Sequence, residues 1–256
     1  MGGFGGDGPT GAGGGLAGPC EDEAKLFIYV LGLDRTLSRF DPQTETLTPM
    51  GPIMCPTEAL PLAYSMAVDR LGRAYVLYNN GELFRVDTKT MECEPLPAYV
   101  PCQYEFCVFG MGFVSDAAGS GEETLHIAAF NSGLAKLDTE TLAVTPVDYF
   151  SEMGGVLVEL TGTAGGELFG FFNWTPPTVA KVDGATGEIL SKMEPALTVG
   201  TSMAFSHWGG RFYLFADEGI WRYDPATDET TTVMADVGFK ISGAGASTCA
   251  PTRVPE

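Results

Sequence analysis

The sequence predicts an all-β fold, a five-bladed β-propeller built from four-stranded antiparallel blades. A short motif recurs along the chain: a strand ending in an apolar residue and an aspartate, then a polar turn, then an outgoing strand. Units of strand, turn and strand at a period of about 40–50 residues are typical of β-propellers. The five motif aspartates, separated by 41 to 51 residues, are Asp41, Asp87, Asp138, Asp183 and Asp224.

Each full repeat contains four candidate strands, which in the second repeat are residues 64–68, 74–78, 82–86 and 93–96. The first strand of a repeat is rich in small residues, which suits the innermost position, where neighbouring backbones approach closely. The second strand is large and apolar, as in AYVLY and LHIAAF, which indicates burial on both faces between adjacent blades. The motif aspartates are expected to form turns and to have no catalytic role, because every blade repeats them.

The two ends of the chain are expected to share one blade. Residues 25–30 have the pattern of a second strand, with no innermost strand before them. Residues 239–246 are rich in small residues, as an innermost strand is, and no hairpin follows them. The C-terminal strand should therefore join the N-terminal blade and close the ring, which removes exposed strand edges.

One propeller domain is expected over residues 20–251, with a short tail over residues 252–256. Residues 1–19 form a glycine-rich leader that lacks the charged and apolar regions of a signal peptide. We expect this leader to be a linker that follows a removed signal sequence.

The six cysteines predict disulfides and an extracytoplasmic, secreted or cell-surface location, because no C-x2-C pair is present and the chain has only two histidines. Cys20 and Cys249 flank the two strands that close the ring, so they are expected to pair. Cys55 lies between blades near the outer strand that Cys93 begins, and these two form the second expected pair. Cys102 and Cys107 remain for a local bridge. The alternative for Cys20 is a lipid-anchor cysteine or an unpaired thiol.

The chain carries 33 acidic and 14 basic residues, for a net charge of −19, which argues against binding nucleic acid or anionic membrane surfaces. The acidity serves solubility or attracts cations or cationic partners. No apolar run is long enough to span a membrane, and we expect a monomer.

A polar residue recurs in the connection between the second and third strands of every blade. Asn-Gly and Asp-x-Gly sequences suit tight hairpins, so a structural role explains them. The functional alternative is a ring of oxygen ligands around one mouth of the propeller, suited to a sugar or to Ca²⁺. The residues are Asp34, Asn79, Asn131, Asn173 and Asp217.

The fourth of these connections is longer and contains Trp174 beside Pro176 and Pro177. An exposed tryptophan next to prolines would form a stacking platform for a carbohydrate ring or a peptide proline. The alternative is a tryptophan that caps the core of its blade.

Glu159 is the candidate catalytic residue, because it stands where other blades carry serine or glycine and would project near the central channel. A buried carboxyl there could have a raised pKa and act as an acid or base. Neither His126 nor His207 has a visible catalytic partner, and no G-x-S-x-G elbow, phosphate-binding loop or dinucleotide fingerprint is present.

Two motifs carry a family resemblance: L-x-R-x-D-x-x-T, at residues 37–44 and 83–90, and S-M-A-x-D-x-x-G-x-x-Y, at residues 65–75. They resemble secreted bacterial β-propellers, loosely similar to NHL, YVTN and SMP-30/gluconolactonase-like repeats. The SMP-30-like enzymes hold a divalent metal in the channel with Glu, Asn and Asp, and the comparable set here is Glu159, Asn131 and Asn173. Those families usually have six blades, more than this chain supplies.

The sequence thus predicts an exported propeller that binds a saccharide or a partner protein at one mouth of the ring, through Asn79, Asn131, Asn173, Trp174 and Asp217. The first alternative is a divalent-metal-dependent hydrolase or lactonase with Glu159 in the channel. The second is a structural surface protein.

Overall fold

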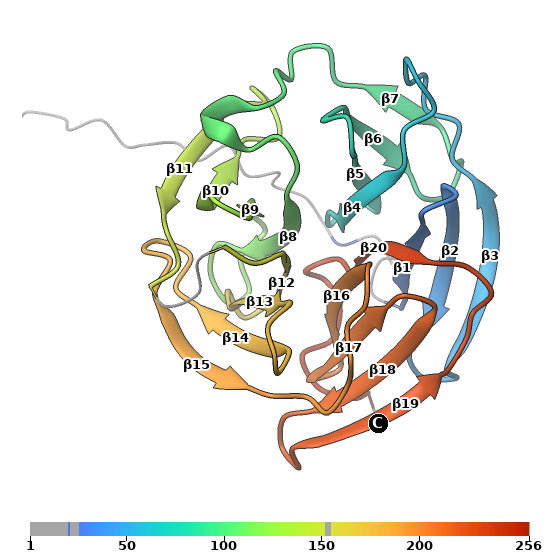
Figure 1. Ribbon diagram of the computed structural model, residues 1–256, viewed down its shortest axis with the longest axis vertical. Helices are drawn as coiled ribbons and strands as arrows, with labels where there is room; N and C mark the ends of the chain where they lie inside the picture. The colour runs from blue at the N-terminus through green and yellow to red at the C-terminus, as the bar shows by residue number, and fades with distance from the viewer. Residues whose placement is uncertain (1–19, 21–25, 152–154, 256) are drawn as a thin grey trace, which may run out of the picture.

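The structure, a computed structural model, describes residue 20 and residues 26–151 and 155–255. Its strands form five four-stranded antiparallel sheets arranged in a ring (Figure 1), so the predicted fold class and blade number are confirmed. The predicted leader, residues 1–19, lies outside the described residues.

Each blade runs from an innermost strand beside the axis to an outermost strand at the rim. We number the blades 1 to 5 from the N-terminus. Blade 1 contains β20 (Ile241–Gly245), β1 (Ile28–Gly32), β2 (Thr36–Asp41) and β3 (Thr46–Pro52). Blade 2 contains β4 (Ala63–Val68), β5 (Arg73–Tyr78), β6 (Leu83–Asp87) and β7 (Cys93–Pro95). Blade 3 contains β8 (Gly110–Ser115), β9 (Glu123–Ala129), β10 (Gly133–Leu137) and β11 (Val144–Asp148). Blade 4 contains β12 (Val158–Gly162), β13 (Leu168–Phe172), β14 (Thr178–Val182) and β15 (Ile189–Met193). Blade 5 contains β16 (Met203–Trp208), β17 (Arg211–Ala216), β18 (Gly219–Asp224) and β19 (Glu229–Met234).

The C-terminal strand closes the ring as the sequence predicts. β20 pairs antiparallel with β1, with Tyr29 opposite Gly245 and Val30 opposite Ala244. It also packs against the innermost strands of both neighbouring blades, β4 and β16. The last strand therefore supplies the innermost position that blade 1 would otherwise lack.

Small residues are needed where the innermost strands meet. A Cβ atom added at Gly110 would lie 2.0 Å from the carbonyl oxygen of Val158 in the next blade. A Cβ at Gly162 would meet the carbonyl oxygen of Phe113 at 2.3 Å. Glycine at these positions lets β8 and β12 approach closely beside the axis, which is the reason the sequence predicts for small residues there.

The repeated aspartates are turn formers, as expected. Asp87 accepts hydrogen bonds from the backbone N–H groups of Lys89 and Thr90, both at 2.8 Å. Asp183 accepts the equivalent bonds from Ala185 and Thr186. The pKa of Asp87 is lowered, first by its bond from Thr90, because these N–H groups stabilise the carboxylate. The same Asx turn recurs at Asp41, Asp138 and Asp224.

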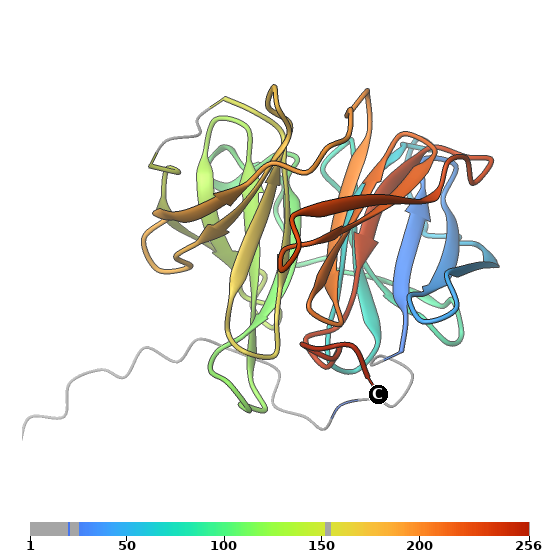
Figure 2. The ribbon, with the colours of Figure 1, turned by 90° about the horizontal axis from the view of Figure 1, so that it is seen from below.

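Three disulfides fasten the chain, and they are the pairs that the sequence predicts: Cys20–Cys249, Cys55–Cys93 and Cys102–Cys107. The first joins the segment before β1 to the segment after β20, at the lower end of the ring in Figure 2, where the C-terminus lies. It therefore fastens the two ends of the chain to one another. The second bridge ties the connection before β4 to the outer strand β7, and the third closes a loop within the connection between β7 and β8.

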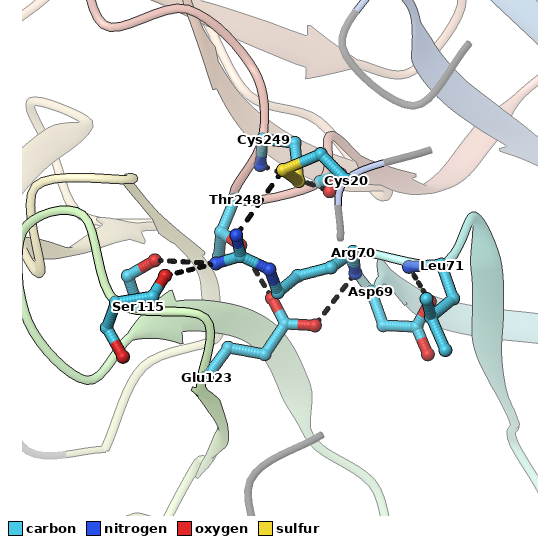
Figure 3. The surroundings of a disulfide bond; sticks show 10 residues. Cys20, Asp69, Arg70, Leu71, Ser115, Glu123, Thr248 and Cys249 are labelled. Atoms are coloured by element: carbon cyan, nitrogen blue, oxygen red, sulfur yellow. Dashed lines mark hydrogen bonds between the residues drawn. A yellow bond between two sulfur atoms is a disulfide. The ribbon is translucent and has the colours of Figure 1, made fainter. Parts of the chain in front are cut away.

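A buried polar network lies against the Cys20–Cys249 bridge. Figure 3 shows the Arg70 side chain between the bridge and Ser115, with its guanidinium 3.4 Å from the Cys20 sulfur and 3.4 Å from Ser115 Oγ. Glu123 accepts hydrogen bonds from the Arg70 backbone N–H at 2.7 Å and from Thr248 Oγ1 at 2.6 Å. The network thus joins blades 2 and 3 to the C-terminal segment.

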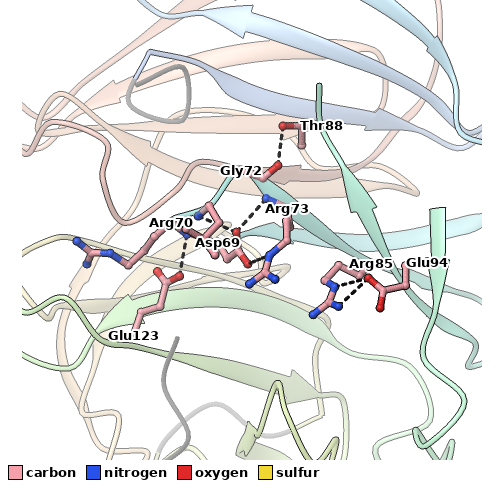
Figure 4. A network of polar contacts seen from close by, with 9 residues as sticks. Asp69, Arg70, Gly72, Arg73, Arg85, Thr88, Glu94 and Glu123 are labelled. Atoms are coloured by element: carbon pink, nitrogen blue, oxygen red, sulfur yellow. Dashed lines mark hydrogen bonds and ion pairs between the residues drawn. The ribbon is translucent and has the colours of Figure 1, made fainter. Parts of the chain in front are cut away.

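Burial raises the pKa values of two carboxyl groups in and beside this network. Desolvation raises the pKa of Glu123 to about 7, although the bonds from Thr248 and Arg70 favour the ionised form. Beside it, Asp69 forms an ion pair with Arg73 at 2.7 Å (Figure 4). Burial also raises the pKa of Asp69, against the opposing effect of Arg73.

Candidate functional site

One end of the ring, called here the upper face, gathers all the connections between second and third strands and all the connections between blades. It is turned upward in Figure 2, opposite the C-terminus. This arrangement follows from four-stranded antiparallel blades, in which both kinds of connection leave the same end. The second-to-third connections are residues 33–35, 79–82, 130–132, 173–177 and 217–218. The described parts of the inter-blade connections are residues 53–62, 96–109, 149–151, 155–157, 194–202 and 235–240.

Two of the predicted ligand-binding residues hold the upper face together. Asn79 Oδ1 accepts a hydrogen bond from the backbone N–H of Leu62 at 3.2 Å. Asp217 accepts bonds from the backbone N–H and the hydroxyl of Thr201, at 3.0 and 3.1 Å. Each side chain thus fastens an inter-blade connection to its own blade, which is the structural role that the sequence leaves open.

The remaining predicted residues have different surroundings from these two. Trp174 is half-buried and packs against the core of blade 4, so the alternative of a tryptophan that caps its blade describes it better than an exposed platform. The backbone N–H of Asn173 donates to the carbonyl of Leu157, whereas Asn131 is exposed. Asp34 bonds to Thr36 within its own turn.

Exposed apolar side chains concentrate on the upper face. Of the eleven large hydrophobic side chains that are exposed in the described part of the chain, eight lie in its connections. Apolar residues collected on one face, rather than scattered singly, mark interaction sites. The eight are Met54, Leu60, Leu62, Val100, Tyr104, Phe130, Tyr149 and Leu157.

Five of these eight side chains lie on two connections that a disulfide fastens. We call residues 53–62 and 96–109 the stapled rim. The Cys55–Cys93 bridge ties the first connection to β7, and the Cys102–Cys107 bridge closes the second on itself. Val100 and Tyr104 are 61% and 66% exposed on the second connection, so the bridges hold apolar side chains out toward solvent.

The stapled rim is also acidic. It carries Glu58 and Glu105, both exposed, and contains no lysine or arginine. Its two connections flank a groove of about 230 Å³ lined by prolines, Tyr99 and Glu82. The rim thus combines rigid apolar groups with uncompensated negative charge.

The second feature of the upper face is a cavity of about 90 Å³ at the mouth of the central channel. Glu159 of β12 lies in its wall, as the sequence predicts for the channel. Its carboxylate reaches across the axis, because Oε2 accepts a hydrogen bond at 2.8 Å from Ser65 Oγ of β4, two blades away. The other lining residues are Leu33, Ala63, Tyr64, Leu157, Val158, Thr201, Ser202, Met203 and Ser242.

Burial raises the pKa of Glu159 well above its ordinary value, against the opposing effects of hydrogen bonds from Ser65 and from the Met111 backbone. In the described part of the chain, no lysine, arginine or histidine forms an ion pair with this carboxyl. The nearby Tyr64 hydroxyl has its pKa raised to about 12, first by burial and then by Glu159. The carboxyl is therefore a desolvated group for which the described residues supply no counter-ion.

The structure does not bring Glu159 together with Asn131 and Asn173, since neither asparagine lines the cavity. Within the described ranges, no three His, Cys, Asp or Glu side chains are grouped as metal ligands would be. The two histidines are buried outside this cavity, with their pKa values lowered to about 4, chiefly by desolvation.

The stapled rim is the part of the site that sequence reasoning misses. Its signal was present, because both inter-blade connections, residues 53–62 and 96–109, are rich in apolar residues and proline, and the second is the longest of the inter-blade connections. Apolar residues in a connection can be either buried or exposed, and the sequence pattern does not separate the two.

No family model and no curated protein matches the sequence, so the resemblance to NHL, YVTN and SMP-30-like repeats has no sequence match behind it. Among solved structures, the extracellular domain of a protein described as a one-component system from B. thetaiotaomicron is similar, with a TM-score of 0.44 and 10% identity over 84% of this chain and 28% of that one. A chain of the mitotic checkpoint complex is similar with a TM-score of 0.42 and 11% identity, over 90% of this chain and 68% of that one. The chain thus spans less than a third of the first of these proteins, and no conclusion about this chain is drawn from either likeness.

The described residues contain no helix with the length and apolar character needed to cross a bilayer.

Proposed function

We propose that this propeller is an extracytoplasmic binding module that docks a partner protein on the stapled rim. The partner segment would present apolar side chains together with lysine or arginine. The single observation that carries the proposal is the placement of five exposed apolar side chains on two disulfide-fastened connections. The three disulfides support a location outside the reducing cytoplasm.

Rigidity and charge give the rim the properties of a docking surface. A loop that is already ordered loses less conformational entropy on binding, so exposed side chains fixed by disulfides favour affinity. The absence of lysine and arginine from the rim sequence, beside Glu58 and Glu105, attracts a basic partner and repels an acidic one. The net charge of −19 strengthens this preference over longer distances at low salt.

The test is a peptide-display selection on the oxidised full chain, followed by titration of the selected peptides. We expect these peptides to combine basic with aromatic or aliphatic residues. Their affinity should fall at least tenfold when Val100 and Tyr104 are both replaced by serine, because the apolar anchors of the rim are lost. Binding should also weaken as the salt concentration rises from about 50 to about 500 mM, because salt screens the attraction between the acidic rim and a basic peptide.

The matched control is Leu190→Ser, which removes an exposed apolar side chain from the outer strand β15 and should leave affinity unchanged. Selected peptides that are acidic, or that bind the Val100→Ser/Tyr104→Ser variant as well as the parent, would contradict the proposal.

A saccharide remains a second candidate ligand, supported by a different part of the upper face. Phe130 and Tyr149 are exposed and line, with Asn131, a cavity of about 220 Å³. Aromatic faces beside an amide are the groups that stack on and hydrogen-bond to a sugar ring. A glycan that binds the parent but not Phe130→Ala, and that ignores the rim substitutions, would favour this candidate.

A further inference from the structure

We infer that the cavity at the mouth of the channel is a binding site for a primary ammonium group on a slender alkyl chain, with the Glu159 carboxylate as its counter-ion. The site is separate from the stapled rim and does not depend on a partner binding there. Both a free alkylamine and the side chain of a lysine carry such an ammonium group. The experiment below distinguishes these two sources.

The hydrogen bonds to the Glu159 carboxyl suit an anion, burial opposes ionisation, and no described residue forms an ion pair with it. Both described hydrogen bonds to Glu159 are donated to it, one by Ser65 Oγ and one by the Met111 backbone. Donors aimed at a carboxyl stabilise its ionised form, whereas complete burial opposes ionisation. A cation in the adjoining cavity would resolve this conflict, because a buried charge is tolerated when it is paired and hydrogen-bonded.

The cavity wall offers further acceptors for an ammonium group. Ser202 Oγ is buried and has no hydrogen-bond partner in the described structure, and Ser242 also lines the cavity. An ammonium has three donors and no acceptor, so a carboxylate oxygen and hydroxyl oxygens are the partners it needs. A divalent metal is less well suited, since Glu159 is the one carboxylate in the lining.

Size and the apolar part of the wall define the rest of the ligand. A cavity of about 90 Å³ has room for roughly four or five non-hydrogen atoms, judged against the larger cavities that admit benzene. Leu33, Leu157 and Met203 supply apolar contacts for methylene groups near the opening. These dimensions match the end of an n-alkylamine, and the carboxylate and hydroxyl oxygens of the wall favour a primary ammonium over a quaternary one, which has no N–H donor.

A cation that bonds to a residue of the cavity wall is Lys240. Lys240 Nζ donates to Thr201 Oγ1 at 3.0 Å, and the pKa of Asp217 is lowered, against the effect of burial, by hydrogen bonds from Thr201 and Ser202 and then by the charge of Lys240. Asp217 and Lys240 thus both bond to Thr201, which lines the cavity, and Glu159 raises the pKa of Tyr64 on β4, after the larger effect of burial. Nothing among these groups neutralises the Glu159 carboxylate.

The test is calorimetric titration of the oxidised full chain with n-butylammonium chloride at pH 6, 7 and 8. We expect saturable binding of one equivalent with release of a proton, because Glu159 must ionise, and we expect affinity to rise with pH over this range. Neutral n-butanol and tetramethylammonium should not bind. Titration with a short peptide containing one lysine then decides the source: tighter binding than n-butylammonium indicates a protein side chain, and weaker binding indicates a free amine.

Two variants make the result specific. Glu159→Gln can keep hydrogen bonds to Ser65 and Met111, so it should fold, and it should weaken n-butylammonium binding at least tenfold. Leu157→Trp leaves the carboxylate in place but covers the opening, and it should also weaken binding, whereas Leu190→Trp on the outer strand should not. Undetectable binding at tens of millimolar ligand, equal binding by n-butanol, or unchanged binding in Glu159→Gln would overturn the inference.

Discussion

Replacing Cys20 and Cys249 together by serine is expected to cause the largest loss of stability of any disulfide removal in this protein. The bridge joins residues 229 positions apart, at the point where the last strand completes the first blade. A cross-link over a loop of this length restricts the unfolded chain by about 5 kcal/mol in the chain-entropy model. For a protein of this size the melting temperature should fall by about 10–20 °C.

The internal comparison is the Cys102→Ser/Cys107→Ser pair, which removes a bridge across only five positions. The same model gives about 2 kcal/mol for so short a loop. Urea unfolding of both variants and the parent at pH 7 measures the two losses. Equal losses in the two variants, or a Cys20→Ser/Cys249→Ser variant as stable as the parent, would show that the ring does not depend on the bridge between its ends.

The second large effect concerns pH, and it arises at Glu123. Its pKa is about 7 in the folded protein, because burial disfavours the carboxylate, and near 4.5 in the unfolded chain. The folded state therefore binds more protons than the unfolded state between these values. Stability from this group is fully present below about pH 4.5 and is lost as the pH rises through 7, a change on the order of 3 kcal/mol.

Glu123→Gln removes this titration while keeping a group that can accept from Arg70 and bond to Thr248. The free energy of unfolding of the variant, measured in urea from pH 4.5 to 8, should fall less steeply than that of the parent. Glu122→Gln makes the same change of charge at the exposed neighbouring position and should leave the slope as it is in the parent. A Glu123→Gln slope identical to the parent's would mean that Glu123 binds the same number of protons in the folded and unfolded states, and would contradict a raised pKa.

The fold could be predicted from the sequence because every blade needs the same turns and the same kinds of residue at equivalent positions. The Asx turn at Asp87 and its counterparts, and the small residues of the innermost strands, are local signals that recur at a regular period. The pairing of Cys20 with Cys249 followed from closure, because only a ring brings the first and last strands together. Glu159 was placed in the channel by comparison with the serine and glycine at the same position in other blades.

The site was less predictable, because it depends on contacts between blades. The hydrogen bond from Ser65 to Glu159 joins side chains 94 residues apart, and the repeat pattern of the sequence does not predict such a contact between blades. The sequence left two alternatives open for Trp174, an exposed platform or a cap on the blade core, and only the packing against blade 4, which half-buries the ring, favours the cap. Asn79 and Asp217 turn toward neighbouring backbone groups, which sequence spacing alone does not distinguish from turning toward a ligand.

Hydrogen–deuterium exchange of the oxidised full chain, with and without a selected basic peptide, tests the docking proposal most directly. If the stapled rim is the docking surface, the peptide should slow exchange at backbone amides of residues 53–62 and 96–109, and this protection should disappear in the Val100→Ser/Tyr104→Ser variant. Protection on the outer strands β11 or β15, or at the lower end of the ring near Cys249, would contradict the account.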